Sequence, residues 1–264
     1  MILRNTAPKR RWLSLVYLMG AMALASALIG CASGGSSNSV GNNTPEGLYG
    51  IAKRALDRGD FLTATDVYES LGAQFPFGPF TQRAQLEVTY AYFKQDEYDN
   101  AIAAADRYIK LYPRDPSVDY ALYMKGLANF SRGGSTTERI FPRNLTHVDQ
   151  NWLRASFVEF DSLVRRYPDS QYTPDAIERM AFLRDAMANH ELTTARYYYN
   201  RGAMVASVNR VTYLLEQFVG SKHVPNALAL LASAQRSLGQ LDLANDTMRV
   251  LAETDPDHPA LARL

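Results

Sequence analysis

Apolar residues recur at steps of three and four from residue 46 onward, and no segment alternates regularly between apolar and polar residues. This spacing predicts helices and no sheet. Four of the predicted helices end at a proline, because proline lacks a backbone N–H and disfavours helical geometry in the residue before it. These stops are Pro76, Pro113, Pro168 and Pro256. We therefore expect an all-α chain.

Small residues and turn residues recur at fixed distances before the stops. The small residues lie twelve positions before each proline stop, where two helices can cross closely, and they are Ala64, Ala101, Ser156 and Ala244. Ser207 lies twelve positions before Val219, which marks a fifth stop without proline. Residues typical of turns lie seventeen positions before four of the stops, and they are Gly59, Asp96, Gly202 and Gly239. The unit resembles the tetratricopeptide repeat, which predicts a right-handed solenoid of five helix-turn-helix repeats.

The spacing of the stops divides the solenoid, expected over residues 46–256, into repeats of unequal length. The expected bounds are 46–78, 79–115, 116–170, 171–221 and 222–256, followed by a C-terminal tail over 257–264. The third repeat holds an insertion over 131–149, because that segment contains two glycines and a proline. In the fourth repeat the first helix is expected to be long, because 175–201 contains neither proline nor glycine.

The N-terminal 30 residues have the layout of an export signal, with a basic segment over 1–11 and an apolar run over 12–29. A helix of that run would reach roughly 27 Å, slightly less than the bilayer core of about 30 Å, so its length does not exclude a membrane-spanning helix. The decisive feature is Leu28-Ile29-Gly30-Cys31, which holds the only cysteine of the chain and resembles the lipobox of bacterial lipoproteins. The resemblance implies a signal peptide over 1–30, a lipid on Cys31 and, with Ala32 next, sorting to the outer membrane. Residues 31–45 are rich in Gly, Ser and Asn and are expected to form a flexible tether.

Composition and motifs indicate a binding protein. Without residues 1–30, the 24 basic residues face 27 acidic ones, and nucleic-acid binding normally needs an excess of positive charge. The sequence contains no HExxH, Walker, GxSxG or CxxC motif, and its four histidines are far apart. We expect no enzyme, no metal site and no cofactor apart from the lipid on Cys31.

Two aromatic segments could serve binding or packing. Tyr197–Tyr199 lie in one predicted helix, where successive residues project about 100° apart, so at least one tyrosine is expected to be exposed unless neighbouring repeats bury both sides. Phe75–Phe80 lie at a predicted turn between repeats, which fits either a packed turn or a binding groove.

Four longer strings make a specific match. They are PFGPF at 76–80, TYAYFK at 89–94, DYALYMKGL at 119–127 and ARYYYNRGAMVASVNR at 195–210. Together with the lipobox and the repeats, they resemble the BamD (ComL) family, the lipoprotein subunits of the bacterial β-barrel assembly machinery. The resemblance implies a lipid-anchored scaffold on the periplasmic face of the outer membrane. A cell-envelope lipoprotein that binds peptidoglycan or a cell-wall enzyme through the same repeats remains the alternative.

The resemblance also implies partners. The C-terminal repeats would bind a POTRA domain of BamA, with Arg210 paired to a POTRA glutamate, and the expected contact residues are Arg210, Asn209, Arg201 and Tyr198. The N-terminal repeats would hold the C-terminal β-signal of unfolded outer-membrane proteins, which is extended and ends in an aromatic residue. The residues expected to line that groove are Phe75, Phe77, Phe80 and Tyr92. BamC would cover the N-terminal half, and BamE would contact the C-terminal end.

Overall fold

The computed structural model describes residues 43–132 and 149–263 of the 264-residue chain. Its helices form five consecutive pairs. The pairs are α3 (Pro45–Asp57) with α4 (Phe61–Gln74), α5 (Pro79–Lys94) with α6 (Tyr98–Leu111), α7 (Val118–Ser131) with α8 (Gln150–Arg166), α9 (Thr173–Asn200) with α10 (Met204–Gln217), and α11 (Val224–Ser237) with α12 (Leu241–Thr254). A short 3-10 helix, η3 (Leu261–Arg263), follows. No strand occurs in these two ranges, so the predicted all-α, tetratricopeptide-like fold is confirmed.

Several sequence predictions fall on residues that the structure does not describe. The signal peptide over 1–30, the lipidation site Cys31 and most of the tether lie outside the described residues, and so do residues 133–148 of the insertion predicted over 131–149. At its ends, Ser131 is the last residue of α7 and Asp149 caps α8. The helices α7 and α8 flank that insertion on either side.

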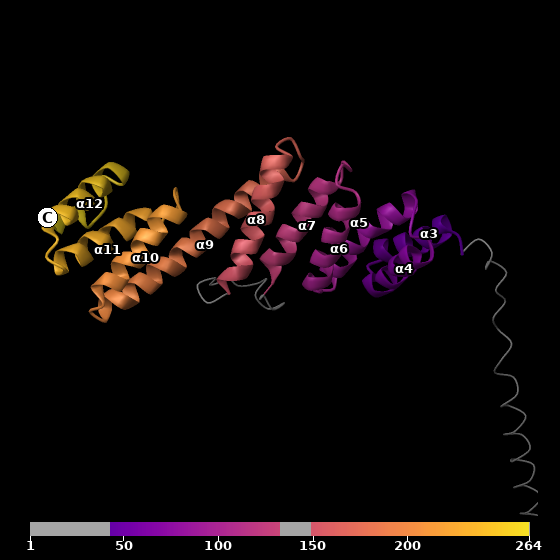
Figure 1. Ribbon diagram of the computed structural model, residues 1–264, viewed down its shortest axis with the longest axis horizontal. Coiled ribbons are helices and arrows are strands. Elements are labelled where there is room, and N and C mark those ends of the chain that lie inside the picture. The colour runs from indigo at the N-terminus through magenta and orange to yellow at the C-terminus, as the bar shows by residue number, and fades with distance from the viewer. Residues whose placement is uncertain (1–42, 133–148, 264) are drawn as a thin grey trace, which may run out of the picture.

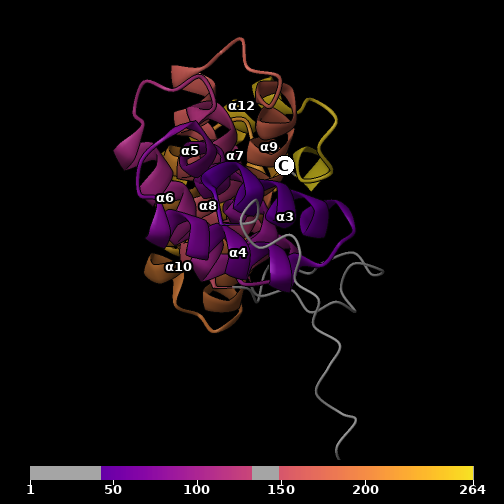
Figure 2. The same cartoon turned by 90° about the vertical axis from the view of Figure 1, so that its right-hand side faces the viewer.

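The pairs stack side by side into an elongated molecule (Figure 1). Each helix packs against the next one in the chain, and the first helices of adjacent pairs also meet, as α3 with α5, α5 with α7, and α9 with α11. The surface formed by these first helices is called the first-helix face below. Figure 2 looks along the stack from the end formed by α3 and α4, with the later pairs behind them.

Turn residues end the first helices as predicted. Gly59, Gly202 and Gly239 have φ angles of 78°, 76° and 76°, and Asp96 has a φ of 60°. Such positive angles suit glycine because it has no Cβ, and Asp tolerates them better than most residues. The chain can therefore reverse within a few residues and lay the second helix against the first.

The second helices end with a shared geometry. At each predicted stop, the residue before the proline donates its backbone N–H to the carbonyl four residues earlier, as Tyr112 does to Tyr108 at 2.9 Å. Phe218 makes the same bond to Leu214 at 2.9 Å although Val219 stands in the place of the proline. Gly220 follows with a φ of 76°, so a glycine turns the chain there in place of a proline stop.

The small residues of the repeat lie where the helices cross. Ala64, Ala101, Ser156, Ser207 and Ala244 are all fully buried. The closest crossing joins α7 and α8, where a Cβ added at Gly126 would lie 2.4 Å from the Cε1 atom of Phe160. Ser156 Oγ donates a hydrogen bond of 2.9 Å to the carbonyl of Gly126 at the same crossing. The crossing thus requires a residue without a side chain at position 126.

The helix α9 is 28 residues long and unbroken, as predicted for the fourth repeat. At 1.5 Å per residue it spans about 42 Å. It packs against α8, α10 and α11, and it runs diagonally between the two halves of the molecule (Figure 1). The main hydrophobic core is continuous from Ala105 to Leu231, so α9 joins the central and C-terminal repeats through buried contacts.

Candidate interaction surfaces

The structure separates the four aromatic residues predicted to form one substrate groove. Phe77 lies at the turn between α4 and α5 and is 88% exposed. Phe80 packs inward, with its ring centroid 5.7 Å from that of Tyr49. Tyr92 is twelve residues further along α5, about 18 Å away, and its hydroxyl donates to Glu69 at 3.2 Å. Phe75 follows α4 directly and is half-buried. The four side chains therefore do not line a common groove.

A different groove lies on the first-helix face of repeats one to three and reaches the start of repeat four, and we call it the N-terminal groove. It has a volume of about 760 Å³ and is lined by α3, α5, the start of α7 and the turn before α9. Tyr90, Tyr120 and Tyr172 supply its aromatic side chains. The Tyr172 ring lies 5.5 Å from Tyr120 and stacks at 4.8 Å on Tyr123, measured between centroids. Ring contacts thus hold Tyr120 and Tyr172, whereas the ring of Tyr90 packs edge-on against Phe61 at 6.4 Å.

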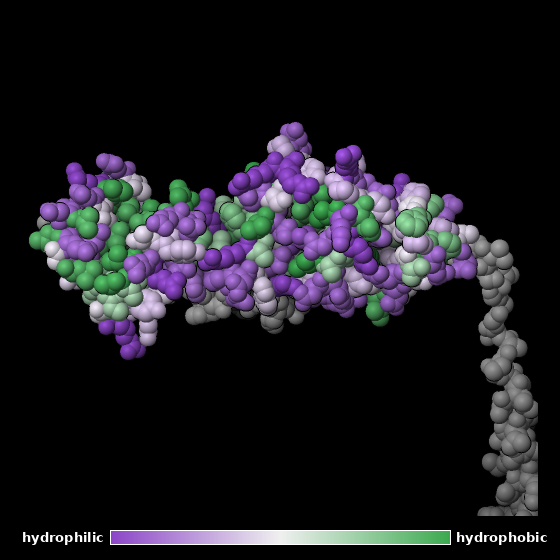
Figure 3. All heavy atoms as spheres, viewed as in Figure 1, coloured by the Kyte–Doolittle hydropathy of each residue, from purple (hydrophilic) through white to green (hydrophobic). Residues whose placement is uncertain are grey.

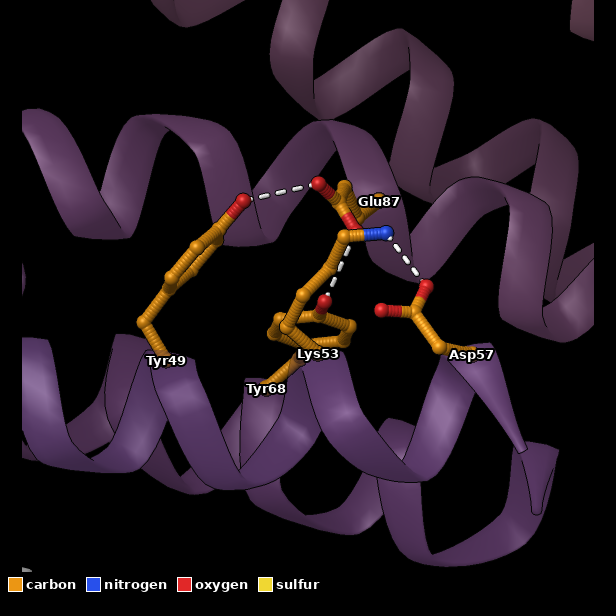
Figure 4. Close-up of polar contacts among 5 residues, drawn as sticks. All are labelled: Tyr49, Lys53, Asp57, Tyr68 and Glu87. Atoms are coloured by element: carbon orange, nitrogen blue, oxygen red, sulfur yellow. Dashed lines mark hydrogen bonds and ion pairs between the residues drawn. The ribbon is translucent and has the colours of Figure 1, made fainter. Parts of the chain in front are cut away.

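Hydrogen bonds to Glu87 hold one wall of the N-terminal groove (Figure 4). The hydroxyl of Tyr49, on α3, donates to Glu87 Oε1 at 2.7 Å, and that of Tyr68, on α4, donates to Oε2 at 2.8 Å. Lys53 Nζ lies 2.7 Å from Asp57 Oδ1 and 3.7 Å from Glu87 Oε2. Three helices therefore share one carboxylate.

The surroundings of Tyr49, Tyr68 and Lys53 favour the protonated form of all three side chains. Burial, and then the hydrogen bond to Glu87, raise the pKa of Tyr49 and of Tyr68, so both hydroxyls remain donors. The hydrogen bond to Asp57 raises the pKa of Lys53 in spite of partial burial. Each oxygen of Glu87 accepts one tyrosine hydroxyl, so this carboxylate links α3 and α4 to α5 at the wall of the groove.

The residues predicted to bind BamA lie at the end of α9 and on α10, a region we call the α9–α10 surface. Arg210 Nη1 contacts Glu191 Oε2 at 3.2 Å, and the Glu191 side chain is only 6% exposed whereas that of Arg210 is 47% exposed. Asn209 is exposed beside Arg210 on α10. Arg210 therefore neutralises a buried carboxylate with one end of its guanidinium, while part of the group faces solvent.

The second part of the α9–α10 surface is the turn after α9. Arg201 ends α9, and its guanidinium lies 5.3 Å from the ring centroid of Tyr197. Tyr197 is 55% exposed, whereas Tyr198 and Tyr199 are half-buried. The prediction that at least one tyrosine of this string is exposed is confirmed, and the exposed one is Tyr197 rather than the predicted contact residue Tyr198.

Sequence reasoning missed Glu191 and the groove tyrosines. Glu191 could have been noticed, because it interrupts the apolar stripe of Met187, Ala188, Leu192 and Ala195 on α9. A carboxylate within such a stripe needs a partner. The approach of Tyr90, Tyr120 and Tyr172 follows from how three repeats stack, and no local signal in the sequence reports it.

The C-terminal end of the stack carries exposed apolar residues, namely Leu238, Leu241, Leu243 and Val250. Hydrophobic surface gathers over the region of α10 to α12 in Figure 3. Within the described ranges, no group of His, Cys, Asp and Glu side chains is arranged to hold a metal ion, and no helix is both long and apolar enough to cross a bilayer.

Comparison with known proteins assigns the chain to a family. The profile of YfiO, described as an outer membrane lipoprotein, matches residues 41–251. The outer membrane protein assembly factor BamD of Neisseria meningitidis serogroup A is 36% identical over 91% of this chain and 91% of its own. The proteins of that name from Xylella fastidiosa strain 9a5c and Vibrio cholerae are each 32% identical, over 91% and 89% of this chain and over 83% and 96% of their own lengths.

Solved structures with a similar fold have low sequence identity to this chain. The TPR2AB-domain:pHSP90-complex of yeast Sti1 is 11% identical, with a TM-score of 0.44 over 82% of this chain and 79% of that chain. The helix pairs and buried small residues described above establish the fold, and the sequence relatives establish the family. The chain belongs to the BamD (YfiO) family of outer-membrane protein assembly factors.

Proposed function

We propose that this protein is a lipid-anchored scaffold that holds a β-signal of an unfolded outer-membrane protein and a POTRA domain of BamA at separate places. The observation that carries the proposal is the position of two different surfaces on one stack of helices. The N-terminal groove belongs mainly to repeats one to three, whereas the α9–α10 surface belongs to repeat four. Both ligands can then bind the same molecule at once.

The chemistry of the N-terminal groove suits an extended segment with aromatic side chains. Tyr90, Tyr120 and Tyr172 offer ring faces and edges, which favour aromatic partners. Asp119 and Glu87 supply carboxylates that can accept main-chain N–H groups of an extended peptide. The volume of about 760 Å³ lies in the range of specific ligand sites, roughly 300–1,000 Å³.

The α9–α10 surface suits a folded partner with an acidic residue. Tyrosine and arginine are enriched among residues that dominate binding energies, and Tyr197, Arg201 and Arg210 are exposed here. A guanidinium has five N–H donors, so Arg210 can pair with a POTRA glutamate while it keeps its bond to Glu191.

Lipidation of Cys31 would moor the scaffold to the periplasmic face of the outer membrane, because several acyl chains on one residue anchor far more stably than a single chain. BamC would run over the N-terminal half, and BamE would cover the apolar end near Leu241 and Leu243. For the anchor, Cys31→Ser is expected to release the protein from outer membranes in alkaline carbonate. A Cys31→Ser protein that stays in the membrane pellet would contradict lipid tethering.

The docking of BamA is tested by capture of the BamA periplasmic domain on immobilised scaffold. Arg210→Glu would place a second carboxylate beside buried Glu191, so its effect on capture would not be separable from unfolding. The double variant Glu191→Gln/Arg210→Gln removes both charges together and keeps the chain neutral at this contact. We expect at least about tenfold weaker capture by this variant.

The matched control is Arg249→Glu on α12, since the Arg249 side chain is 76% exposed and pairs only with Asp246 among the residues described. Capture that is equal for the double variant and the control would refute docking through Arg210. Strong sedimentation with purified sacculi, without capture of BamA, would instead support the alternative of a cell-wall binding lipoprotein.

A further inference from the structure

A second groove lies on the first-helix face near the C-terminus, and we call it the C-terminal groove. It has a volume of about 380 Å³ and lies between the last part of α9, the length of α11 and the turn that follows α12. Arg196 comes from α9, Asn226 and Arg236 from α11, and His258 from the turn. His258 Nδ1 accepts the N–H of Ala260 at 3.2 Å, which fixes the turn at the edge of the groove.

The polar lining of the C-terminal groove is entirely without carboxylates. Arg196 and Arg236 are both exposed, and neither guanidinium group makes a hydrogen bond or an ion pair with a residue in the described ranges. Some other arginines of the fold contact carboxylates, as Arg179 does with Asp175 and Arg210 with Glu191. Two unpaired guanidinium groups on one small hollow produce a local positive potential that attracts anions.

Apart from Ser233, the remaining lining of the C-terminal groove is apolar, and its members Ala229, Leu230 and Met248 are called its floor below. A volume of about 380 Å³ is near the lower end for specific ligand sites, enough for a few side chains. A hollow between helices admits projecting side chains, whereas the surface of a bilayer is flat. An acidic peptide with apolar neighbours therefore matches the groove better than an anionic membrane does.

We propose that the C-terminal groove is a docking site for a short acidic segment of a protein partner, whose carboxylates pair with Arg196 and Arg236 while an adjacent apolar side chain packs on the floor. Arginine is suited to this task because its planar fork can form two parallel hydrogen bonds to one carboxylate. The site is distinct from the α9–α10 surface, since Arg210 and Arg201 are not part of its lining. The inference goes beyond the proposed function and holds whichever protein carries the segment.

The two grooves on the first-helix face differ in charge, so an acidic segment should bind to only one of them. Asp57, Glu87 and Asp119 outnumber Lys53 in the N-terminal groove, whereas the C-terminal groove carries two arginines and no acid. An acidic segment is repelled by the first groove and attracted by the second. Binding at the C-terminal groove should accordingly weaken as salt is added.

The experiment measures fluorescence anisotropy of a labelled hexapeptide of alternating Glu and Leu, titrated with the full chain purified in detergent. We expect saturable binding, at least about tenfold weaker in Arg196→Glu/Arg236→Glu. The control Arg249→Glu, which makes the same change outside the groove, is expected to bind like the unaltered protein. A hexapeptide of alternating Lys and Leu should bind the double Glu variant better than it binds the unaltered protein.

Both arginines are exposed and unpaired within the described ranges, so the double variant is expected to keep its thermal melt. If the melt falls, Arg196→Gln/Arg236→Gln gives the same comparison without added negative charge. Equal affinity for a Gln–Leu hexapeptide, or an unchanged affinity in the double variant, would overturn the proposal. So would binding to phosphatidylglycerol vesicles that depends on both arginines while the acidic peptide does not bind.

Discussion

Replacing Gly126 by alanine tests the close crossing of α7 and α8 on which the third repeat depends. The new Cβ would lie 2.4, 2.6 and 2.8 Å from three ring carbons of Phe160, whereas carbon atoms in contact prefer about 3.5–4.0 Å. Phe160 is fully buried, so its ring cannot swing into solvent. The helices must separate by about 1 Å, and overpacking of this kind costs about 1–3 kcal/mol.

The gain in helix propensity from Gly to Ala is about 1 kcal/mol, so we expect Gly126→Ala to lower the free energy of unfolding by up to about 2 kcal/mol. For a domain of this size that corresponds to a fall of up to about 8 °C in Tm. Circular dichroism at 222 nm (far-UV), recorded on the full chain during heating, measures it.

The matched control is Gly72→Ala in α4, where an added Cβ would meet no atom within 4 Å. The same substitution is expected to raise the free energy of unfolding there by up to about 1 kcal/mol. A Gly126→Ala protein that melts at or above the temperature of the unaltered chain would refute the close crossing. A destabilised Gly72→Ala protein would show that packing around the added Cβ does not decide whether a Gly→Ala change raises or lowers the free energy of unfolding.

Three further predictions concern charge, pH and exposure. Arg210→Ala leaves the buried carboxylate of Glu191 without its partner, so urea unfolding should show a free energy of unfolding about 1–2 kcal/mol lower. Most of this loss should disappear in Arg210→Ala/Glu191→Gln, and equal losses in both variants would contradict the pairing. Burial raises the pKa of Asp115, but hydrogen bonds from Tyr108 and other donors lower it overall. The ionised carboxylate therefore stabilises the folded protein above about pH 4, and this contribution is lost as the pH falls through the folded pKa of Asp115. The difference in Tm between the unaltered chain and Asp115→Asn should therefore shrink between pH 7 and pH 3, and a constant difference would exclude this linkage. Phe77→Ser should change the free energy of unfolding by less than about 0.5 kcal/mol, because that ring is 88% exposed, and a larger loss would show that it packs against the fold.

Most of the fold could be predicted because its signals are local. A proline stop, a glycine with positive φ and a small residue at a crossing each act within one helix pair, and Gly59, Ala64 and Pro76 show all three in the first repeat. The stop at Val219 shows that a helix can end at the predicted place without a proline. Phe218 leaves its helix through the same hydrogen bond, and Gly220 turns the chain where other repeats use proline.

The candidate surfaces were harder to predict because they depend on contacts between repeats. Tyr92 was expected to face a groove, but its hydroxyl reaches Glu69 on α4, while Tyr90 lines the groove instead. The choice between these two faces of α5 depends on how α3 and α7 stack beside it. Tyr197 and Glu191 lie on the same helix and still differ completely in exposure, which is decided by the position of α10.

In the proposed scaffold, one stack of helices has two independent docking surfaces, so both ligands should bind at the same time. The measurement is isothermal titration of a peptide with the sequence of a client β-signal into the full chain, alone and already saturated with the BamA periplasmic domain. We expect one peptide per chain and the same affinity in both titrations. Loss of peptide binding in the presence of BamA would contradict it.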